Sequence, residues 1–198
     1  KQGRDRNFQA ILPLRGKILN IEKTDDSKIY KNTEIQSLIT ALGLGIKGED
    51  FEVSSLRYHR VVIMTDADVD GAHIASLLMT FFWDQMRELI FRGHLFLALP
   101  PLYRIAQGNK TAYAMDDGER DRIIEQDFSR RGRIEISRFK GLGEMPASQL
   151  KETTMSPERR TLLRIKAPSA DRDADLFGET NTLIEDLMGR KPERRLAF

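Results

Sequence analysis

Three aspartates at alternate positions, Asp66, Asp68 and Asp70, follow a short β-branched apolar run and precede a segment of helical periodicity. In an extended backbone, side chains two residues apart point the same way, so three carboxylates would repel one another unless a cation joined them. Their hard oxygen atoms suit magnesium, manganese or calcium. Proteins of the α/β class also place ligand sites where a strand ends and a helix begins. The spacing therefore predicts a divalent-metal site.

Two other interpretations of the aspartates have to be weighed. The pattern Asp-x-Asp-x-Asp-Gly matches the first half of an EF-hand calcium loop. Counting Asp66 as position one, position twelve is Leu77 rather than the required glutamate, and the preceding segment is strand-like rather than helical. The other alternative is a polar loop in which one aspartate caps the next helix, which accounts for one carboxylate but not for three.

The elements around the aspartates predict a strand–helix–strand unit. Residues 61–64 (VVIM) form the first expected strand, and apolar residues then recur at helical spacing as far as residue 90, with Met79 and Trp83 half exposed. The uninterrupted apolar run at residues 95–99 (LFLAL) is typical of a strand covered on both faces in a parallel sheet. We therefore expect an α/β fold, with a Rossmann-like parallel sheet flanked by helices.

The rest of the chain is punctuated by caps and turns. Asn32 or Thr33 can begin a helix that stops at Gly43, and Asp116 or Asp117 can begin another. Further expected elements are a hairpin across residues 107–109, a half-buried strand at 134–139, a helix at 147–152, a strand at 162–166 and a closing helix at 171–188. These elements suggest two domains, residues 1–115 and a small C-terminal α+β subdomain at 116–198.

Composition sets outer limits on function. With 198 residues, 40% of them hydrophobic, the chain can bury a sizeable core, and its lack of cysteine fits a reducing, intracellular setting. No apolar run approaches the roughly 18 to 20 residues of a membrane span, and we expect a soluble protein without a membrane partner. The formal net charge is only +2, so binding to a polyanion would depend on local patches.

Two basic stretches are candidates for such contacts. The first 17 residues carry one acid, Asp5, and five basic residues: Lys1, Arg4, Arg6, Arg15 and Lys17. They could contact phosphates or form a solvated basic face. The second stretch, residues 140–145 (KGLGEM), places two glycines beside Lys140, which is compatible with a tight turn or with close approach of the backbone to a phosphate.

Five motifs in order give a family resemblance. They are residues 1–6 (KQGRDR), 13–20 (PLRGKILN), 64–74 (MTDADVDGAHI), 100–103 (PPLY) and 138–145 (RFKGLGEM). Together they resemble the TOPRIM domain and C-terminal tail of the B subunit of a bacterial type II DNA topoisomerase. Other TOPRIM enzymes, such as primases and type IA topoisomerases, are disfavoured by the KGLG and PLRGK motifs.

The resemblance implies a TOPRIM fold that binds Mg²⁺, with Mn²⁺ or Ca²⁺ as possible substitutes, for reversible DNA cleavage. It makes Asp66 and Asp68 the principal ligands and Asp70 a supporting acid, and it places a further glutamate ligand ahead of Lys1, outside this sequence. It also implies that Arg4, Arg6, Arg15, Lys17 and Lys140 contact DNA phosphates, and that cleavage-stabilising drugs bind near Lys17. His73 is as well explained by a structural role at the helix N-terminus as by contact with DNA.

The resemblance also implies partners. Double-stranded DNA would be cleaved by a tyrosine of the A subunit in an A2B2 heterotetramer in the bacterial cytoplasm, associated with the nucleoid, and ATP would bind only through a domain that nothing here resembles. The tyrosines Tyr30, Tyr58, Tyr103 and Tyr113 are then expected to be packing residues. The short interval between residues 113–117 and KGLG lacks the insertion of Gram-negative gyrases and favours the B subunit of topoisomerase IV, with gyrases that lack the insertion as the alternative. A non-catalytic DNA- or partner-docking module is the alternative of a different class.

Overall fold

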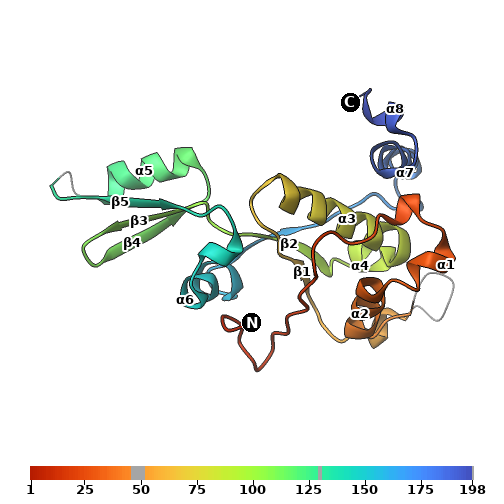
Figure 1. Ribbon diagram of the computed structural model, residues 1–198, viewed down its shortest axis with the longest axis horizontal. Helices are drawn as coiled ribbons and strands as arrows, with labels where there is room; N and C mark the ends of the chain where they lie inside the picture. Colours follow the sequence, from red (N-terminus) through yellow and green to blue (C-terminus); the bar gives the residue numbers. More distant parts are fainter. Residues whose placement is uncertain (46–51, 129–130, 198) are drawn as a thin grey trace. The chain divides into compact units, whose positions relative to one another are not determined.

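The computed structural model describes residues 1–45, 52–128 and 131–197 (Figure 1). The chain forms two compact units, each made of three separate stretches. Unit 1 comprises Lys1–Ile11, Met64–Ala72 and Ala98–Leu163, and unit 2 comprises Leu12–Ile63, His73–Leu97 and Arg164–Phe198. The units are thus interleaved along the sequence, whereas the division at residue 115 is linear and stays a prediction.

The parallel strands expected around the aspartates are confirmed. Strand β1 (Val61–Ile63) pairs in parallel with β2 (Leu95–Leu99), and Val61 lies opposite Leu95. The third strand, β6 (Thr161–Arg164), completes the order β1-β2-β6. The first strand ends at Ile63, so its carboxyl end leads directly into the acidic loop.

Helix α2 (Thr33–Leu42) shows how closely local signals fix some elements. The Asn32 side chain accepts hydrogen bonds from the backbone N–H groups of Glu34 and Ile35, and Gly43 ends the helix with a φ of 74°. Both ends are those predicted, because a side-chain acceptor and a left-handed glycine satisfy the free backbone groups at helix ends. Other short helical elements of unit 2 include η1 (Ile21–Lys23), α1 (Asp26–Ile29), η2 (Val53–Ser55) and α8 (Pro192–Arg195).

The helix after the aspartates is shorter than predicted. Helix α3 (Val69–Gln85) stops at Met86, whose φ of −138° and ψ of 46° are not helical, and α4 (Arg87–Phe91) follows. The Met86 carbonyl accepts a hydrogen bond from the Leu89 N–H, which turns the chain while keeping Met86 and Leu89 fully buried. The expectation of one continuous helix to residue 90 was therefore wrong.

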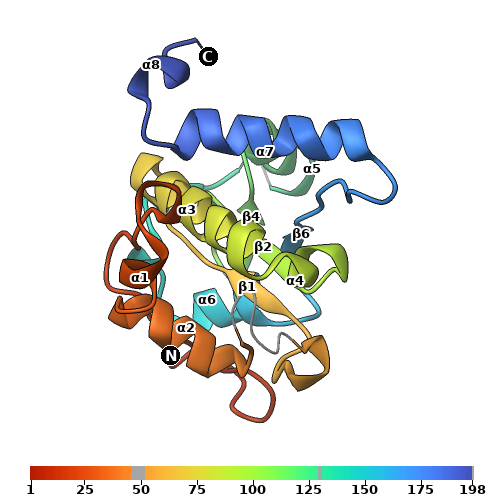
Figure 2. The same cartoon turned by 90° about the vertical axis from the view of Figure 1, so that its right-hand side faces the viewer.

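Trp83 is buried, with 4% of its surface exposed, and the expectation that it is half exposed was wrong. The cause is α7 (Ala174–Met188), which lies across α3 (Figure 2). The Trp83 Nε1–H donates to Asn181 Oδ1 at 3.0 Å, and its ring packs against Phe177 with centroids 5.4 Å apart. The guanidinium of Arg87 stacks 4.2 Å from the same ring. Burial raises the cost of the charged form and lowers the pKa of Arg87.

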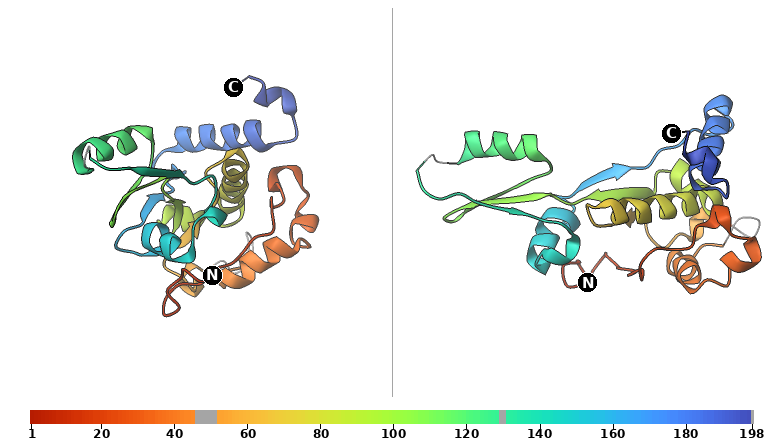
Figure 3. Two further views of the ribbon diagram at one scale, coloured as in Figure 1. Left: turned by 60° about the vertical axis from the view of Figure 1, so that its left-hand side comes forward. Right: turned by 45° about the horizontal axis from the view of Figure 1, so that its top comes forward.

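Unit 1 contains an antiparallel sheet with the order β4-β3-β5. Strands β3 (Tyr103–Gln107) and β4 (Lys110–Ala114) form the predicted hairpin, with Gly108 at a φ of 58°. Helix α5 (Asp117–Asp127), capped by Asp116, lies along this sheet and packs its partly buried Ile123 and Ile124 against it (Figure 3, right).

Strand β5 (Glu135–Arg138) exists as predicted but is not half buried. All four of its residues are exposed, including Ile136 at 50%. Among the described strands it lies at the edge of its sheet and pairs with β3 alone, and the apolar residues of α5 pack against β3 and β4 instead. After β5 come η3 (Leu142–Glu144), α6 (Ala147–Leu150) and the π-helical turn η4 (Lys151–Met155). Within the described residues, no helix combines the length and apolar character that a bilayer crossing requires.

Candidate metal site and phosphate-contact residues

The three aspartates do not form the extended run that their spacing suggested. Asp66 lies in the loop after β1, Asp68 directly precedes α3, and Asp70 is in the first turn of that helix. All three are exposed. The alternation of strand side chains therefore does not explain how these carboxylates are arranged, since the helix begins in the middle of the motif.

Asp68 caps α3. Its Oδ1 accepts a hydrogen bond from the Gly71 N–H at 2.7 Å, and its backbone carbonyl accepts from the Ala72 N–H at 3.0 Å. The capping interpretation is thus correct for this one residue. A carboxylate has two oxygens with two acceptor sites each, so one capping bond leaves acceptor sites for a metal.

Asp66 is held by two glycines and a backbone N–H. A Cβ on Gly71 would overlap the Asp66 carbonyl oxygen and lie 2.8 Å from its carbonyl carbon. A Cβ on Gly141 would lie 3.0 Å from Asp66 Cγ, and the Leu142 N–H donates to Asp66 Oδ1 at 2.8 Å. Sequence reasoning missed these contacts, although the paired glycines of KGLG were a signal that some group approaches that backbone closely.

The donor chemistry of Asp66 and Asp68 fits a hard divalent cation. In the part of the chain that the structure describes, neither carboxylate forms an ion pair with a lysine or arginine. Within those same residues, no group of three or more His, Cys, Asp or Glu side chains is arranged to hold a metal ion. The residues present therefore fit two anionic ligands of a site rather than a complete ligand set.

The candidate phosphate-contact residues divide between the units. Arg4, Arg6 and Lys140 belong to unit 1 together with the aspartates, whereas Arg15 and Lys17 are exposed residues of unit 2. Arg4 donates from Nη1 to the Lys1 carbonyl at 3.1 Å, and Arg6 and Lys140 are exposed. The structure thus brings three of the five predicted residues into the compact unit that holds the acids.

The N-terminal segment that carries Arg4 and Arg6 is anchored in unit 1. A Cβ on Gly3 would lie 2.9 Å from the carbonyl oxygen of Ala147, so the segment packs directly on α6. The Gln9 side-chain amide donates to the Met155 carbonyl at 2.7 Å, which ties the segment to η4. These contacts hold the two arginines on a defined stretch of chain.

Two of the tyrosines form hydrogen bonds within the fold. The Tyr103 hydroxyl donates to Asp117 Oδ1 at 2.7 Å, and that hydrogen bond is the main cause of a raised Tyr103 pKa and a lowered Asp117 pKa. Tyr30 donates to Gln85 Oε1 at 3.1 Å. His73 is an exposed residue of α3. For Tyr30 and Tyr103 the packing interpretation is confirmed.

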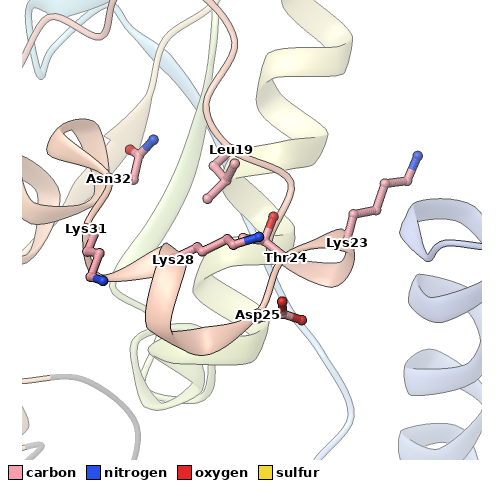
Figure 4. Close-up of a pocket in the computed structure, with 7 residues that line it drawn as sticks. All are labelled: Leu19, Lys23, Thr24, Asp25, Lys28, Lys31 and Asn32. Carbon is pink, nitrogen blue, oxygen red and sulfur yellow. The ribbon is translucent and has the colours of Figure 1, made fainter.

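Unit 2 has a cavity of about 380 Å³ that includes none of the aspartates of the motif (Figure 4). Its lining contains three lysines, Lys23, Lys28 and Lys31, and the figure shows the ammonium groups of Lys23 and Lys31 pointing in different directions. Asp25 in the same lining is bound by Arg190 at 2.8 Å. This arrangement is typical of a solvated basic face, because the lysine side chains do not converge on one point.

Comparison with known proteins first identifies the class of domain that contains the aspartates. Residues 1–98 match the model of the Toprim domain, and residues 131–198 match the model described as the carboxyl terminus of the DNA gyrase B subunit. The fold class expected from the sequence is thereby confirmed: a Toprim domain with parallel strands flanked by helices, followed by a part with a small antiparallel sheet.

Individual relatives then give the family. Over all 198 residues the chain is 58% identical to the DNA gyrase B subunit of Synechocystis and 54% identical to the DNA topoisomerase 4 B subunit of Bartonella bacilliformis. It is 51% identical over 195 residues, 98% of the chain, to the chloroplastic/mitochondrial gyrase B subunit of Oryza sativa. The chain belongs to the family of type II topoisomerase B subunits and corresponds to their Toprim and carboxyl-terminal regions. It spans 18%, 28% and 26% of the lengths of these three relatives.

Proposed function

We propose that this chain supplies the metal-binding acids and part of the DNA-phosphate contacts of a type II topoisomerase. The observation that carries the proposal is the pair of exposed carboxylates, Asp66 and Asp68, at the end of a parallel strand in a Toprim domain. Asp66 is held by a neighbouring loop, and neither carboxylate is neutralised by a cation of the described residues. Asp70 is assigned a supporting role.

Bound Mg²⁺ at this site would polarise the scissile phosphate and stabilise negative charge at the reacting phosphorus and leaving oxygen. The residues of the chain contribute the carboxylates for the metal and the basic side chains that position the DNA. Asp66 and Asp68 provide two fixed negative charges, and Arg4, Arg6 and Lys140 of the same unit bind phosphates of the DNA backbone, which positions DNA without reading its sequence. Arg15 and Lys17 are assigned the same role from unit 2, with cleavage-stabilising drugs binding near Lys17.

The partners follow from the family. A DNA-cleaving tyrosine would come from an A subunit in an A2B2 complex, a further glutamate ligand from the segment before Lys1, and ATP hydrolysis from another domain of the same polypeptide. We place such a complex on DNA in the bacterial cytoplasm. Since the relatives include both gyrase and topoisomerase IV at similar identity, the assignment to topoisomerase IV rather than gyrase stays a prediction. Its support is the interval between β4 and η3, which holds α5 and β5 and no long inserted domain.

The test of the metal assignment uses the full-length polypeptide reconstituted with its A subunit. Asp66→Ala combined with Asp68→Ala should abolish Mg²⁺-dependent DNA cleavage while the protein still folds and assembles with that partner. Wild-type cleavage by the double variant would refute the assignment. If the chain is instead a docking module, neutralising Arg4, Arg6 and Lys17 should remove the salt dependence of DNA binding, while the double variant and metal have no effect.

A separate assay distinguishes topoisomerase IV from gyrase. The same reconstituted complex is given relaxed plasmid and interlinked DNA circles with ATP. We expect decatenation without net negative supercoiling if the chain belongs to topoisomerase IV. Introduction of negative supercoils would assign it to gyrase.

A further inference from the structure

The KGLG loop contacts the carboxylate on which the proposed site depends. Gly141 and Leu142 lie 75 and 76 residues after Asp66 in the sequence, yet both touch its side chain within unit 1. A Cβ added to Gly141 would lie 3.0 Å from Asp66 Cγ and 3.1 Å from each carboxylate oxygen. The Asp66 carboxylate therefore occupies the space that a side chain at residue 141 would fill.

The loop is itself held in place. The Lys140 N–H donates to Glu144 Oε2 at 2.8 Å, and the Glu144 N–H donates to the Gly141 carbonyl at 3.1 Å, which closes the turn. The buried side chains of Phe139 and Met145 anchor its two ends. The Phe139 N–H also donates to the carbonyl of Leu102, directly before β3, at 2.8 Å. Asp66 thus contacts a loop that is held in place by its own hydrogen bonds and by buried residues at both of its ends.

The backbone at Asp66 is fixed from the other side. Gly71, in the first turn of α3, approaches the Asp66 peptide so closely that no side chain fits there. Backbone and side chain of Asp66 are therefore set by different parts of the chain. A ligand with its orientation fixed before binding loses less conformational freedom when it binds a metal.

We propose that Gly141 and the Leu142 N–H are positioning groups, which hold the Asp66 carboxylate in the orientation that binds the metal. This inference rests on the proposed function. It also gives the KGLG motif a role that differs from the direct phosphate approach considered from the sequence. Partners that orient metal ligands typically contribute about 10- to 100-fold to metal affinity.

Two substitutions disturb the two contacts separately, one by adding bulk against the carboxylate and one by removing the hydrogen-bond donor. Gly141→Ala places a methyl group against the carboxylate, and the extended φ of −160° at this residue is one that alanine adopts. Leu142→Pro removes the N–H donor at the first residue of η3 and puts the ring Cδ where the hydrogen pointed at Asp66 Oδ1, so the carboxylate loses its hydrogen bond and is displaced. The extended Gly141 before it suits a following proline. Gly143→Ala is the matched control, because nothing lies within 4 Å of a Cβ at that position.

The measurement is Mn²⁺ binding by electron paramagnetic resonance on the full-length polypeptide with its A subunit and DNA, together with the Mg²⁺ concentration that gives half-maximal cleavage. Gly141→Ala and Leu142→Pro should each weaken metal binding by about 10-fold or more. They should raise the half-maximal Mg²⁺ concentration by a similar factor, with cleavage recovering at saturating Mg²⁺. Gly143→Ala should change both by less than about twofold.

The Asp66→Ala variant separates this inference from the proposed function. If Asp66→Ala abolishes metal binding but Gly141→Ala and Leu142→Pro bind Mn²⁺ like wild type, the positioning role is refuted and the metal site stands. If Asp66→Ala itself binds Mn²⁺ like wild type, the proposed function fails first.

Discussion

Asp68 has two assigned roles that a pair of substitutions can separate. As the residue before α3 it caps the helix through one hydrogen bond to the Gly71 N–H, at 2.7 Å. As a carboxylate it is assigned as a metal ligand. Asparagine is about as good a cap as aspartate, since it keeps an acceptor oxygen at the same position, but it is neutral and a much weaker ligand. Alanine removes both properties.

The expected changes in stability follow from the single capping hydrogen bond of Asp68. Asp68→Ala should cost about 1 kcal/mol of stability. In a chain of this size that corresponds to a fall in Tm of about 2–4 °C. Asp68→Asn should leave Tm within about 1 °C of wild type, since the two residues cap helices almost equally well. Both variants should lose Mg²⁺-dependent DNA cleavage.

The assay pairs thermal unfolding in a chelator, followed by circular dichroism, with DNA cleavage by the reconstituted complex. Asp116 provides the matched control, because it caps α5 through the Glu119 N–H at 2.8 Å and is remote from the motif in sequence. Asp116→Ala should lower Tm as Asp68→Ala does, with cleavage intact. If Asp68→Asn cleaves DNA like wild type, Asp68 is only a cap and the reasoning about its second role is wrong.

Three further predictions concern stability. Trp83→Ala should cost about 3–5 kcal/mol in chemical denaturation, because it empties a buried site between α3 and α7, whereas Trp83→Phe should cost much less. The Tyr103–Asp117 hydrogen bond should stabilise the fold above the ordinary Asp pKa of 3.8 and be lost in acid as Asp117 protonates, and it should be lost again as pH rises past 10.0 and Tyr103 ionises. Tyr103→Phe should flatten both limbs of the Tm–pH curve, and unchanged limbs would contradict this. Gly178→Ala in α7 should raise stability by about 0.5–1 kcal/mol, since nothing lies within 4 Å of the new Cβ, and a lower Tm would count against it.

Elements with local signals at both ends were predictable from the sequence. Helix α2 has a side-chain cap at Asn32 and a left-handed Gly43, and the β3–β4 hairpin has Gly108 in its turn. In each case the deciding interaction joins residues fewer than five positions apart. Such interactions can be identified in the sequence itself.

The errors arose where a distant segment decides the outcome. Trp83 lies off the main apolar face of its helix, and only the packing of α7 across it makes it buried. Ile136 alternates like a half-buried strand residue, but the apolar residues of α5 pack elsewhere in its sheet and leave it exposed. Periodicity describes which residues share a face and does not say what covers that face.

The same distinction applies to the site. The residue types of the acidic motif pointed to a metal, but their arrangement was misjudged, because α3 begins inside the motif and Asp68 becomes its cap. The contact between Asp66 and the KGLG loop joins residues 76 positions apart. The sequence contained both motifs without showing that they touch.

The most direct test of the central claim is a Mn²⁺ titration of the full-length polypeptide, assembled with its A subunit and DNA, followed by electron paramagnetic resonance. We predict saturable Mn²⁺ binding that Mg²⁺ displaces and that is lost when Asp66 and Asp68 are both replaced by alanine, with the Tm reduced only by the lost cap. Mn²⁺ binding that is unchanged in this double variant would contradict the account.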